Sequence, residues 1–89
     1  MIDVIELQFT EKNLRKLLGD DWSVIKQYAN DLCGAVRKEY PEMEIQVSFW
    51  RYHDEDLFLF NQKELFYENE EMYNDLHIII NKFNEDISK

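Results

Sequence analysis

The side chains of this sequence that could act as nucleophile, base or metal ligand are few and stand far apart. The one cysteine, Cys33, has Arg37 as the only basic residue three or four positions away, which is typical of a packed, unreactive thiol. His77 lies on the flank of an amphipathic segment, where a boundary histidine is more common than a catalyst. The stretch from His53 to Asp56 offers carboxylates to a hard cation, but it lacks the glycine and the distal glutamate of an EF-hand loop. We therefore expect no catalytic residue and no metal site.

The sequence also offers no cradle for a cofactor. It has 2 glycines in 89 residues, so neither a P-loop nor a dinucleotide-binding loop can be built, and no Cys/His pair has the spacing of a zinc site. Pairs of carboxylates, which glycoside hydrolases use, occur in any acidic protein and distinguish nothing here. The sequence thus predicts a protein that is not an enzyme and that binds no cofactor.

Acidic residues, in contrast, are numerous and unevenly placed. The chain carries 19 of them against 10 basic residues, which gives a net charge of −9. Residues 1–41 have a net charge of −1, whereas residues 42–89 have a net charge of −8. Within residues 53–75, Lys63 is the only lysine or arginine. The acidic residues of this stretch are the candidates for binding a partner by imitating phosphates: Asp54, Glu55, Asp56, Glu64, Glu68, Glu70, Glu71 and Asp75.

The elements that must position these carboxylates follow from the hydrophobic pattern. Alternating apolar residues predict strands over 2–9 and from residue 43 to about 52, and a short apolar run predicts another over 57–60. Apolar spacings of three and four predict helices over 11–18, from about 22 to 39 and from about 70 to 86. The expected buried stripes are Trp22, Ile25, Ala29, Leu32 and Val36 on the second helix and Met72, Leu76, Ile79, Ile80, Phe83 and Ile87 on the last. Residues 64–67 are either a further strand or the lead into the last helix. Thr10 and either Asp20 or Asp21 are the expected N-caps, and Gly19 is the expected end of the first helix.

This pattern predicts one domain over 1–89 with an α+β fold. Its order is β-α-α-β-β-(β)-α, a small antiparallel sheet with three helices on one face. Because helices of so small a domain can cover only one face, the aromatic residues of the sheet have two interpretations. They form either an ordinary core or an exposed patch that holds a homodimer together. The residues of that patch would be Trp50, Tyr52, Phe58 and Phe60.

Carboxylates in rows can imitate the phosphates of DNA, which follow one another at roughly 1.7 Å of helix axis per charge. Glu68, Glu71 and Asp75 have spacings of three and four, at which helical neighbours lie about 5–6 Å apart, and residues 54–56 can extend the row. Like charges at this spacing cost a few tenths of a kcal/mol per pair, so their retention indicates selection for the electric field. The expected partner is a basic DNA-binding protein, and no direct contact with nucleic acid is expected. The other interpretation is a solvated face that keeps the protein in solution.

In length, charge and low glycine content the chain resembles the small phage proteins that disarm host defences by mimicking DNA. The anti-restriction proteins of T-even phages are the nearest in size, and acidic anti-CRISPR proteins are a second group. The resemblance covers the whole chain and rests on composition, without a diagnostic motif. It implies a phage early protein that occupies, as a homodimer, the DNA path of a host restriction enzyme such as a modification-dependent one. The stretch to which this role transfers runs from Asp54 to Asp75.

Two other classes of function remain open. An immunity protein or antitoxin would block one basic toxin with a focused acidic cluster, and an acidic adaptor or structural subunit would involve no mimicry. For all three we expect a cytoplasmic protein. One cysteine cannot form an internal disulfide, and no apolar run approaches the roughly 18–20 residues that span a bilayer.

Overall fold

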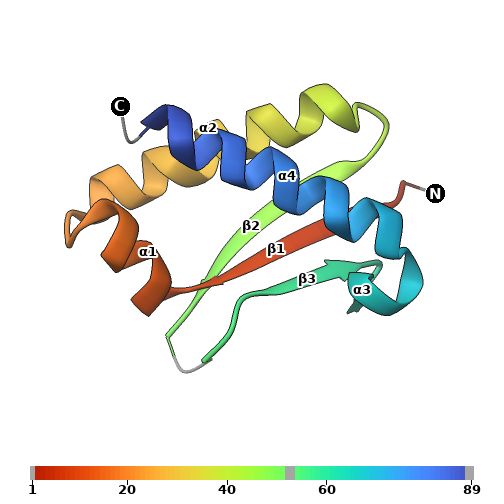
Figure 1. Ribbon diagram of the computed structural model, residues 1–89, viewed down its shortest axis with the longest axis horizontal. Helices are drawn as coiled ribbons and strands as arrows, with labels where there is room; N and C mark the ends of the chain where they lie inside the picture. Colours follow the sequence, from red (N-terminus) through yellow and green to blue (C-terminus); the bar gives the residue numbers. More distant parts are fainter. Residues whose placement is uncertain (1, 52–53, 88–89) are drawn as a thin grey trace.

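The computed structural model describes residues 2–51 and 54–87, and its elements follow one another in the expected order. Strand β1 (Val4–Thr10) leads into helices α1 (Glu11–Leu18) and α2 (Trp22–Glu39). Strands β2 (Glu44–Trp50), β3 (Leu57–Phe60) and β4 (Lys63–Glu64) come next, and helices α3 (Leu65–Glu68) and α4 (Glu70–Ile87) follow them. Helices α1, α2 and α4 lie together on one side of the sheet (Figure 1). The prediction of an α+β fold is confirmed.

The sheet is mixed, which corrects the expected antiparallel arrangement. Its strands lie in the order β2-β1-β3-β4. Strand β1 pairs with β2 in parallel, with Ile5 beside Ile45, and with β3 in antiparallel fashion, with Leu7 beside Phe58. The parallel pair arises because two helices connect β1 to β2. Such a crossover returns the chain to the end of the sheet where β1 began, whereas a tight turn would have reversed its direction.

The core lies between the inner face of the sheet and the helical layer. Its most completely buried side chains come from β1, α2, α3 and α4, among them Ile5, Leu7, Leu32, Leu65 and Leu76. In the antiparallel pair, Leu7 lies beside Phe58 and Ile5 beside Phe60, so both phenylalanines point toward the helices. Every element of the fold except the short β4 contributes at least one buried residue to this core, α1 through Leu14 alone.

Helix α2 buries a stripe that is shifted from the expected one. Tyr28 was not expected inside, yet it is buried, and its hydroxyl donates a 2.7 Å hydrogen bond to Oδ1 of Asn84 on α4. Trp22 was expected inside, yet it is 44 % exposed, with its ring against that of Phe49. On α4, Leu76 and Ile80 of the expected stripe are buried, whereas Ile87 at the end of the helix is exposed. The shift leaves one tryptophan on the surface beside β2.

The first two helices have N-caps, and the first helix a C-terminal glycine, at the predicted residues. The Oγ1 atom of Thr10 accepts a hydrogen bond from the backbone N–H of Asn13, and Oδ1 of Asp21, rather than of Asp20, accepts one from the N–H of Ser23. Gly19 ends α1 with a φ of +86°, and its N–H donates to the carbonyl of Arg15. Helix α1 is thus held at both ends.

The segment after β3 settles the ambiguity at residues 64–67. Asn61 and Gln62 both have positive φ angles, of 50° and 69°, as a two-residue hairpin turn requires. After the two residues of β4, the chain turns once as α3, so the segment begins as a strand and continues as a helix. Extended backbone at Asn69 then separates α3 from α4. The described chain therefore has four helices where three were expected.

Candidate functional site: an acidic surface

The eight carboxylates predicted to bind a partner lie on consecutive pieces of the chain, and all are exposed. We call them the acidic surface. Asp54, Glu55 and Asp56 precede β3, Glu64 ends β4, Glu68 ends α3, and Glu70, Glu71 and Asp75 lie in the first turns of α4. The structure places five of them at two hollows: Glu55, Asp56 and Glu64 at one lined by aromatic rings, and Glu71 and Asp75 at one beside Tyr40.

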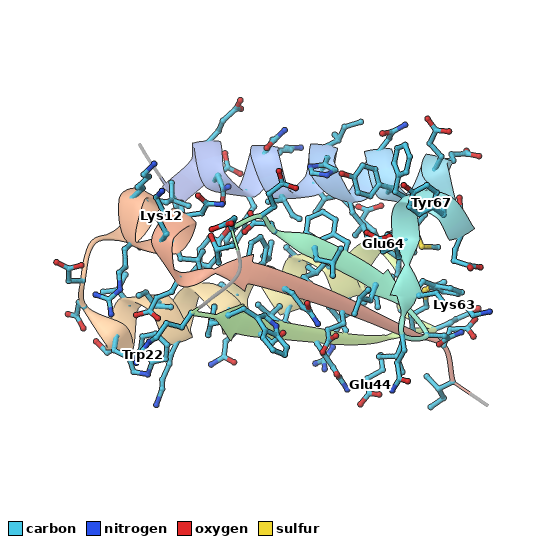
Figure 2. The ribbon with its side chains drawn as sticks, turned by 90° about the horizontal axis from the view of Figure 1, so that it is seen from below. Lys12, Trp22, Glu44, Lys63, Glu64 and Tyr67 are labelled. Carbon is cyan, nitrogen blue, oxygen red and sulfur yellow. The ribbon has the colours of Figure 1, made fainter. Side chains whose placement is uncertain are left out.

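The first group borders a hollow of about 200 Å³. Glu55, Asp56 and Glu64 line it together with the aromatic residues Phe58, Phe66, Tyr67 and Tyr73. The ring centre of Phe66 lies 5.2 Å from those of both Tyr67 and Tyr73, and Tyr67 is 78 % exposed. Figure 2 shows Glu64 and Tyr67 at the same end of the molecule. An ammonium or guanidinium group that enters the hollow meets carboxylates and aromatic rings together.

Asp56 also has a structural role. Its Oδ1 accepts a 2.7 Å hydrogen bond from the backbone N–H of Thr10 and a 3.2 Å bond from Nδ2 of Asn13. These contacts attach the segment before β3 to the start of α1, across 46 residues of sequence. The sequence-based interpretation of Asp56 as a freely exposed charge is therefore incomplete, because this carboxylate is committed to the fold.

We expect Asp56→Ala to lower the free energy of unfolding by about 1–2 kcal/mol, because the Thr10 amide then loses a charged acceptor. The matched control is Asp54→Ala, two residues away, whose carboxylate makes no hydrogen bond or ion pair with another described residue. It should change stability by less than about 0.5 kcal/mol. Urea denaturation of both variants measures the difference, and equal stability would show that the Asp56 contacts contribute nothing.

The second group lies on α4. The hydroxyl of Tyr40 donates a hydrogen bond to Oδ2 of Asp75, and Glu71 and Asp75 border a shallow hollow beside Tyr40 and the exposed Ile78. Burial and then Asp75 raise the pKa of Tyr40 to about 12. Asp75, like Asp56, thus has a partner within the protein.

The expected row of Glu68, Glu71 and Asp75 on one helix is wrong in one respect. Glu68 belongs to α3, and the extended residue Asn69 separates it from the helix that carries the other two. Only Glu71 and Asp75 keep the spacing of four on α4. The three carboxylates therefore do not form one straight row along a single helix.

The two tyrosines with raised pKa values predict how stability changes at alkaline pH. Burial raises the pKa of Tyr28 to about 12, as burial and Asp75 do for Tyr40, whereas an unfolded tyrosine titrates near 10. Their contribution to stability is complete below pH 10 and is lost as the pH rises from 10 to 12, because the unfolded chain releases these protons first.

We expect the wild type to lose roughly 1 kcal/mol between pH 8 and pH 11 through Tyr28 alone. A variant with Tyr28→Phe and Tyr40→Phe should lose correspondingly less over the same interval. Urea midpoints of both proteins at the two pH values test this expectation. An equal loss in both would assign the alkaline sensitivity to other groups.

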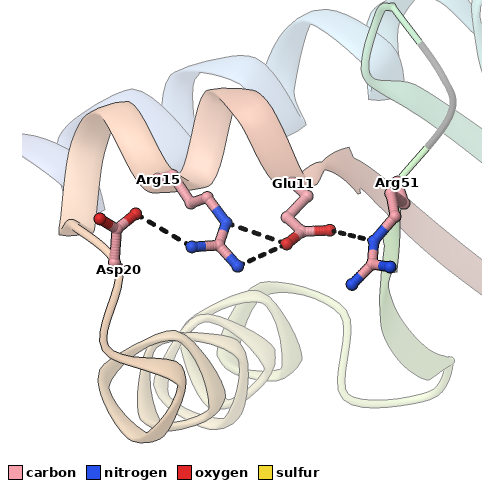
Figure 3. Close-up of polar contacts among 4 residues, drawn as sticks. All are labelled: Glu11, Arg15, Asp20 and Arg51. Carbon is pink, nitrogen blue, oxygen red and sulfur yellow. Dashed lines mark hydrogen bonds and ion pairs between the residues drawn. The ribbon is translucent and has the colours of Figure 1, made fainter.

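Ion pairs lie at a different part of the molecule. Figure 3 shows Glu11 between Arg15 and Arg51, with Arg15 also bound to Asp20. The hydrogen bond from Arg15, and then that from Arg51, lowers the pKa of Glu11. Among the described residues these are the only ion pairs between side chains. Basic side chains therefore neutralise carboxylates around α1 and leave the acidic surface without counterions of its own.

The residues predicted to form an aromatic dimer patch do not share one surface. Trp50 lies beside Thr10 on β1 and is 39 % exposed, with its Nε1 donating to Oγ of Ser48 on the outer face of the sheet. Phe58 is buried on the opposite, helix-covered face, and Phe60 is half-buried there. Tyr52 lies outside the described residues. The grouping of Trp50 with Phe58 and Phe60 is wrong because β3 places its phenylalanines, not its leucines, toward the helices.

The two residues considered for nucleophilic or acid–base chemistry are held by packing. The Sγ atom of the half-buried Cys33 donates a 3.3 Å hydrogen bond to the carbonyl of Ile45. The ring of His77 packs against Phe58 and Tyr73, and its enclosed Nε2 has no hydrogen-bond partner among the described residues. In the described part of the chain no three His, Cys, Asp or Glu side chains gather as metal ligands, and no described helix is long and apolar enough to cross a membrane.

Phe66, Tyr67 and Tyr73 are the residues of this site that the sequence reasoning missed. Two adjacent aromatics followed by a glutamate, inside the most acidic stretch of the chain, were the available signal. One helical turn cannot bury two consecutive side chains on the same side, so at least one of Phe66 and Tyr67 had to reach solvent. Comparison of the chain with protein-family models, with curated proteins and with solved structures finds no match.

Proposed function

We propose that this protein inhibits a basic DNA-binding protein by presenting its acidic surface in place of DNA. The observation that carries the proposal is the state of six carboxylates in that surface. None of them forms a hydrogen bond or ion pair with another described residue: Asp54, Glu55, Glu64, Glu68, Glu70 and Glu71. Six uncompensated charges on one surface repel one another in the free protein, and a basic groove removes that repulsion on binding.

The rigid setting of these charges supports mimicry. Glu64 directly precedes Leu65, which is completely buried, and Glu68 ends the one-turn helix that Leu65 begins. Glu71 lies at the N-terminus of α4, where Asn69 Oδ1 accepts from the N–H of Met72. The phosphates of DNA are also held on a stiff backbone. A groove shaped for DNA can therefore bind these carboxylates with little entropic cost of ordering them.

A second function is favoured by the hollow of Glu55, Glu64, Phe66, Tyr67 and Tyr73. It concentrates charge and ring faces at one place, as an immunity protein or antitoxin needs in order to hold one basic residue of one toxin. DNA mimicry and specific neutralisation of a toxin differ in the number of proteins that they inhibit. A mimic acts on several unrelated DNA-binding proteins, whereas an immunity protein acts on one.

The test is competition for labelled duplex DNA bound to three unrelated basic proteins: a modification-dependent restriction enzyme, a nucleoid protein and a sequence-specific repressor. We expect the protein to release DNA from more than one of them, with weaker release as salt rises. The protein alone should not shift the DNA, because its charge of −9 repels a polyanion.

Release from none of the three would overturn DNA mimicry. The toxin-directed function has its own test, a pull-down from bacterial lysate at low and high salt. One small basic protein retained at both salt concentrations would favour that function, and a spread of DNA-binding proteins retained only at low salt would favour mimicry.

A further inference from the structure

The two edges of the sheet are protected to very different degrees. Strand β4 forms one edge and is two residues long, with the charged pair Lys63 and Glu64. Strand β2 forms the other edge and runs for seven residues without proline, lysine or arginine, and its only charge is Glu44 at the start. Short length, charge and proline are the usual means by which an edge avoids pairing with another strand. Strand β2 has none of these along most of its length.

The backbone groups of β2 that face outward can be identified from the ladder to β1. The N–H of Glu44 donates to the carbonyl of Asp3, so the N–H and C=O groups of residues 44, 46, 48 and 50 point toward β1. Those of Ile45, Val47 and Phe49 therefore point away from the sheet. The thiol of Cys33 donates to the carbonyl of Ile45, which agrees with this direction.

We propose that β2 pairs with β2 of a second copy of this chain, in antiparallel register centred on Val47, to give one continuous sheet of eight strands. In this register Val47 exchanges two backbone hydrogen bonds with its own counterpart. Ile45 exchanges two with Phe49 of the second copy, and the symmetric pair does the same. The outward-facing N–H and C=O groups of all three residues then have partners on the second strand, and the Ile45 carbonyl accepts from the Cys33 thiol as well.

The side chains and charges of β2 suit a second copy rather than another peptide. The strand begins with Glu42 and Glu44 nearby and ends beside Arg51, whose guanidinium also pairs with Glu11. Antiparallel pairing therefore brings each acidic end next to the arginine of the other copy. Glu64 ends the opposite edge strand, β4. Figure 2 shows β2 along one border of the sheet, with Glu64 and Tyr67 on the other side. Two copies can therefore join at β2 without bringing their Glu64 side chains together.

The register also covers the exposed tryptophan of α2. The ring of Trp22 packs on Phe49, and Cys33 contacts Ile45. Since Phe49 lies opposite Ile45 of the second copy, Trp22 comes beside the Cys33 end of the second α2. Ala29, one turn before Cys33, and the neighbouring Gly34, which has open space around its Cα, let the two helices approach. A dimer at this edge thus accounts for an apolar side chain that the single chain leaves 44 % exposed.

A pair of double variants tests the register. On the outer face of the sheet Gln46 lies opposite Ser48 of the second copy. Gln46→Lys with Ser48→Lys places like charges opposite each other twice, and Gln46→Lys with Ser48→Glu places opposite charges there. We expect the dissociation constant of the dimer, measured by analytical ultracentrifugation, to be roughly tenfold or more higher for the first variant than for the second. Both variants keep the backbone bonds to β1, and their circular dichroism should match the wild type.

Hydrogen exchange supplies a second readout on the wild type. In the proposed dimer the amides of Ile45, Val47 and Phe49 are protected together with those of Gln46 and Ser48, and their protection weakens on dilution. A protein that sediments as a monomer at millimolar concentration, with these three amides exchanging fast, would overturn the proposal. Equal dissociation of the two double variants would overturn the register. The inference does not depend on the proposed basic partner, because neither readout involves one.

Discussion

Replacing the six uncompensated carboxylates of the acidic surface by their amides should lower the association rate with a basic DNA-binding protein by roughly 10- to 1,000-fold at low salt. The variant carries Asp54→Asn together with Glu→Gln at positions 64, 68, 70, 71 and 55. Asp56 and Asp75 stay unchanged because they accept hydrogen bonds from Thr10 and Tyr40. Folding should be unaffected or slightly improved, since removal of like-charge repulsion relieves a few tenths of a kcal/mol per pair.

The control for this variant removes charge elsewhere. Amides at Glu39, Glu42, Glu85 and Asp86, all of them exposed and outside the acidic surface, should leave association within a few-fold of the wild type. Binding kinetics at two salt concentrations, beside a thermal melt, give the answer. If the six-site variant melts normally, binds at the wild-type rate and keeps the wild-type salt slope, the acidic surface is not the binding surface.

Leu65→Ala should destabilise the protein by about 2–5 kcal/mol, as expected for a completely buried leucine. Leu65 is completely buried, and it anchors the one-turn helix that carries Phe66 and Tyr67. The matched control is Ile78→Ala on α4, where the side chain is 65 % exposed and the change should cost less than about 0.5 kcal/mol. Denaturation in urea measures both variants. A small effect at Leu65 would mean that α3 can be lost without harm to the core.

Periodicity along the sequence predicts the elements of this fold closely, because it reports which face of each segment meets the core. Helices α1 and α2 begin and end at the expected residues, since Thr10, Asp21 and Gly19 act locally. Periodicity carries no information on which strands are neighbours. The parallel pairing of β1 with β2, and the inward direction of Phe58, depend on contacts between residues far apart in the chain. A run such as Leu57–Phe60, apolar on both faces, leaves its direction open until its partner is known.

The acidic surface shows the same limit. Composition located the carboxylates, and all eight are exposed. Composition could not show that Asp56 and Asp75 accept hydrogen bonds within the protein, because their partners Thr10 and Tyr40 lie 46 and 35 residues away in the sequence. It also missed the hollow, because Glu55 and Glu64 meet only when β3 and β4 fold back on each other. Charge on a surface is visible in a sequence, whereas the shape of that surface is not.

The attachment of Asp56 to the start of α1 has a consequence for the thermodynamics of binding. Asp56, which directly follows Asp54 and Glu55, accepts hydrogen bonds from the Thr10 backbone and the Asn13 side chain before any partner arrives. Ordering a loose segment on complex formation would oppose binding by about 1–2 kcal/mol per residue of backbone entropy. A segment that is already ordered avoids most of this loss. Association through this end of the acidic surface should therefore show a small entropic penalty and little change in backbone order on binding.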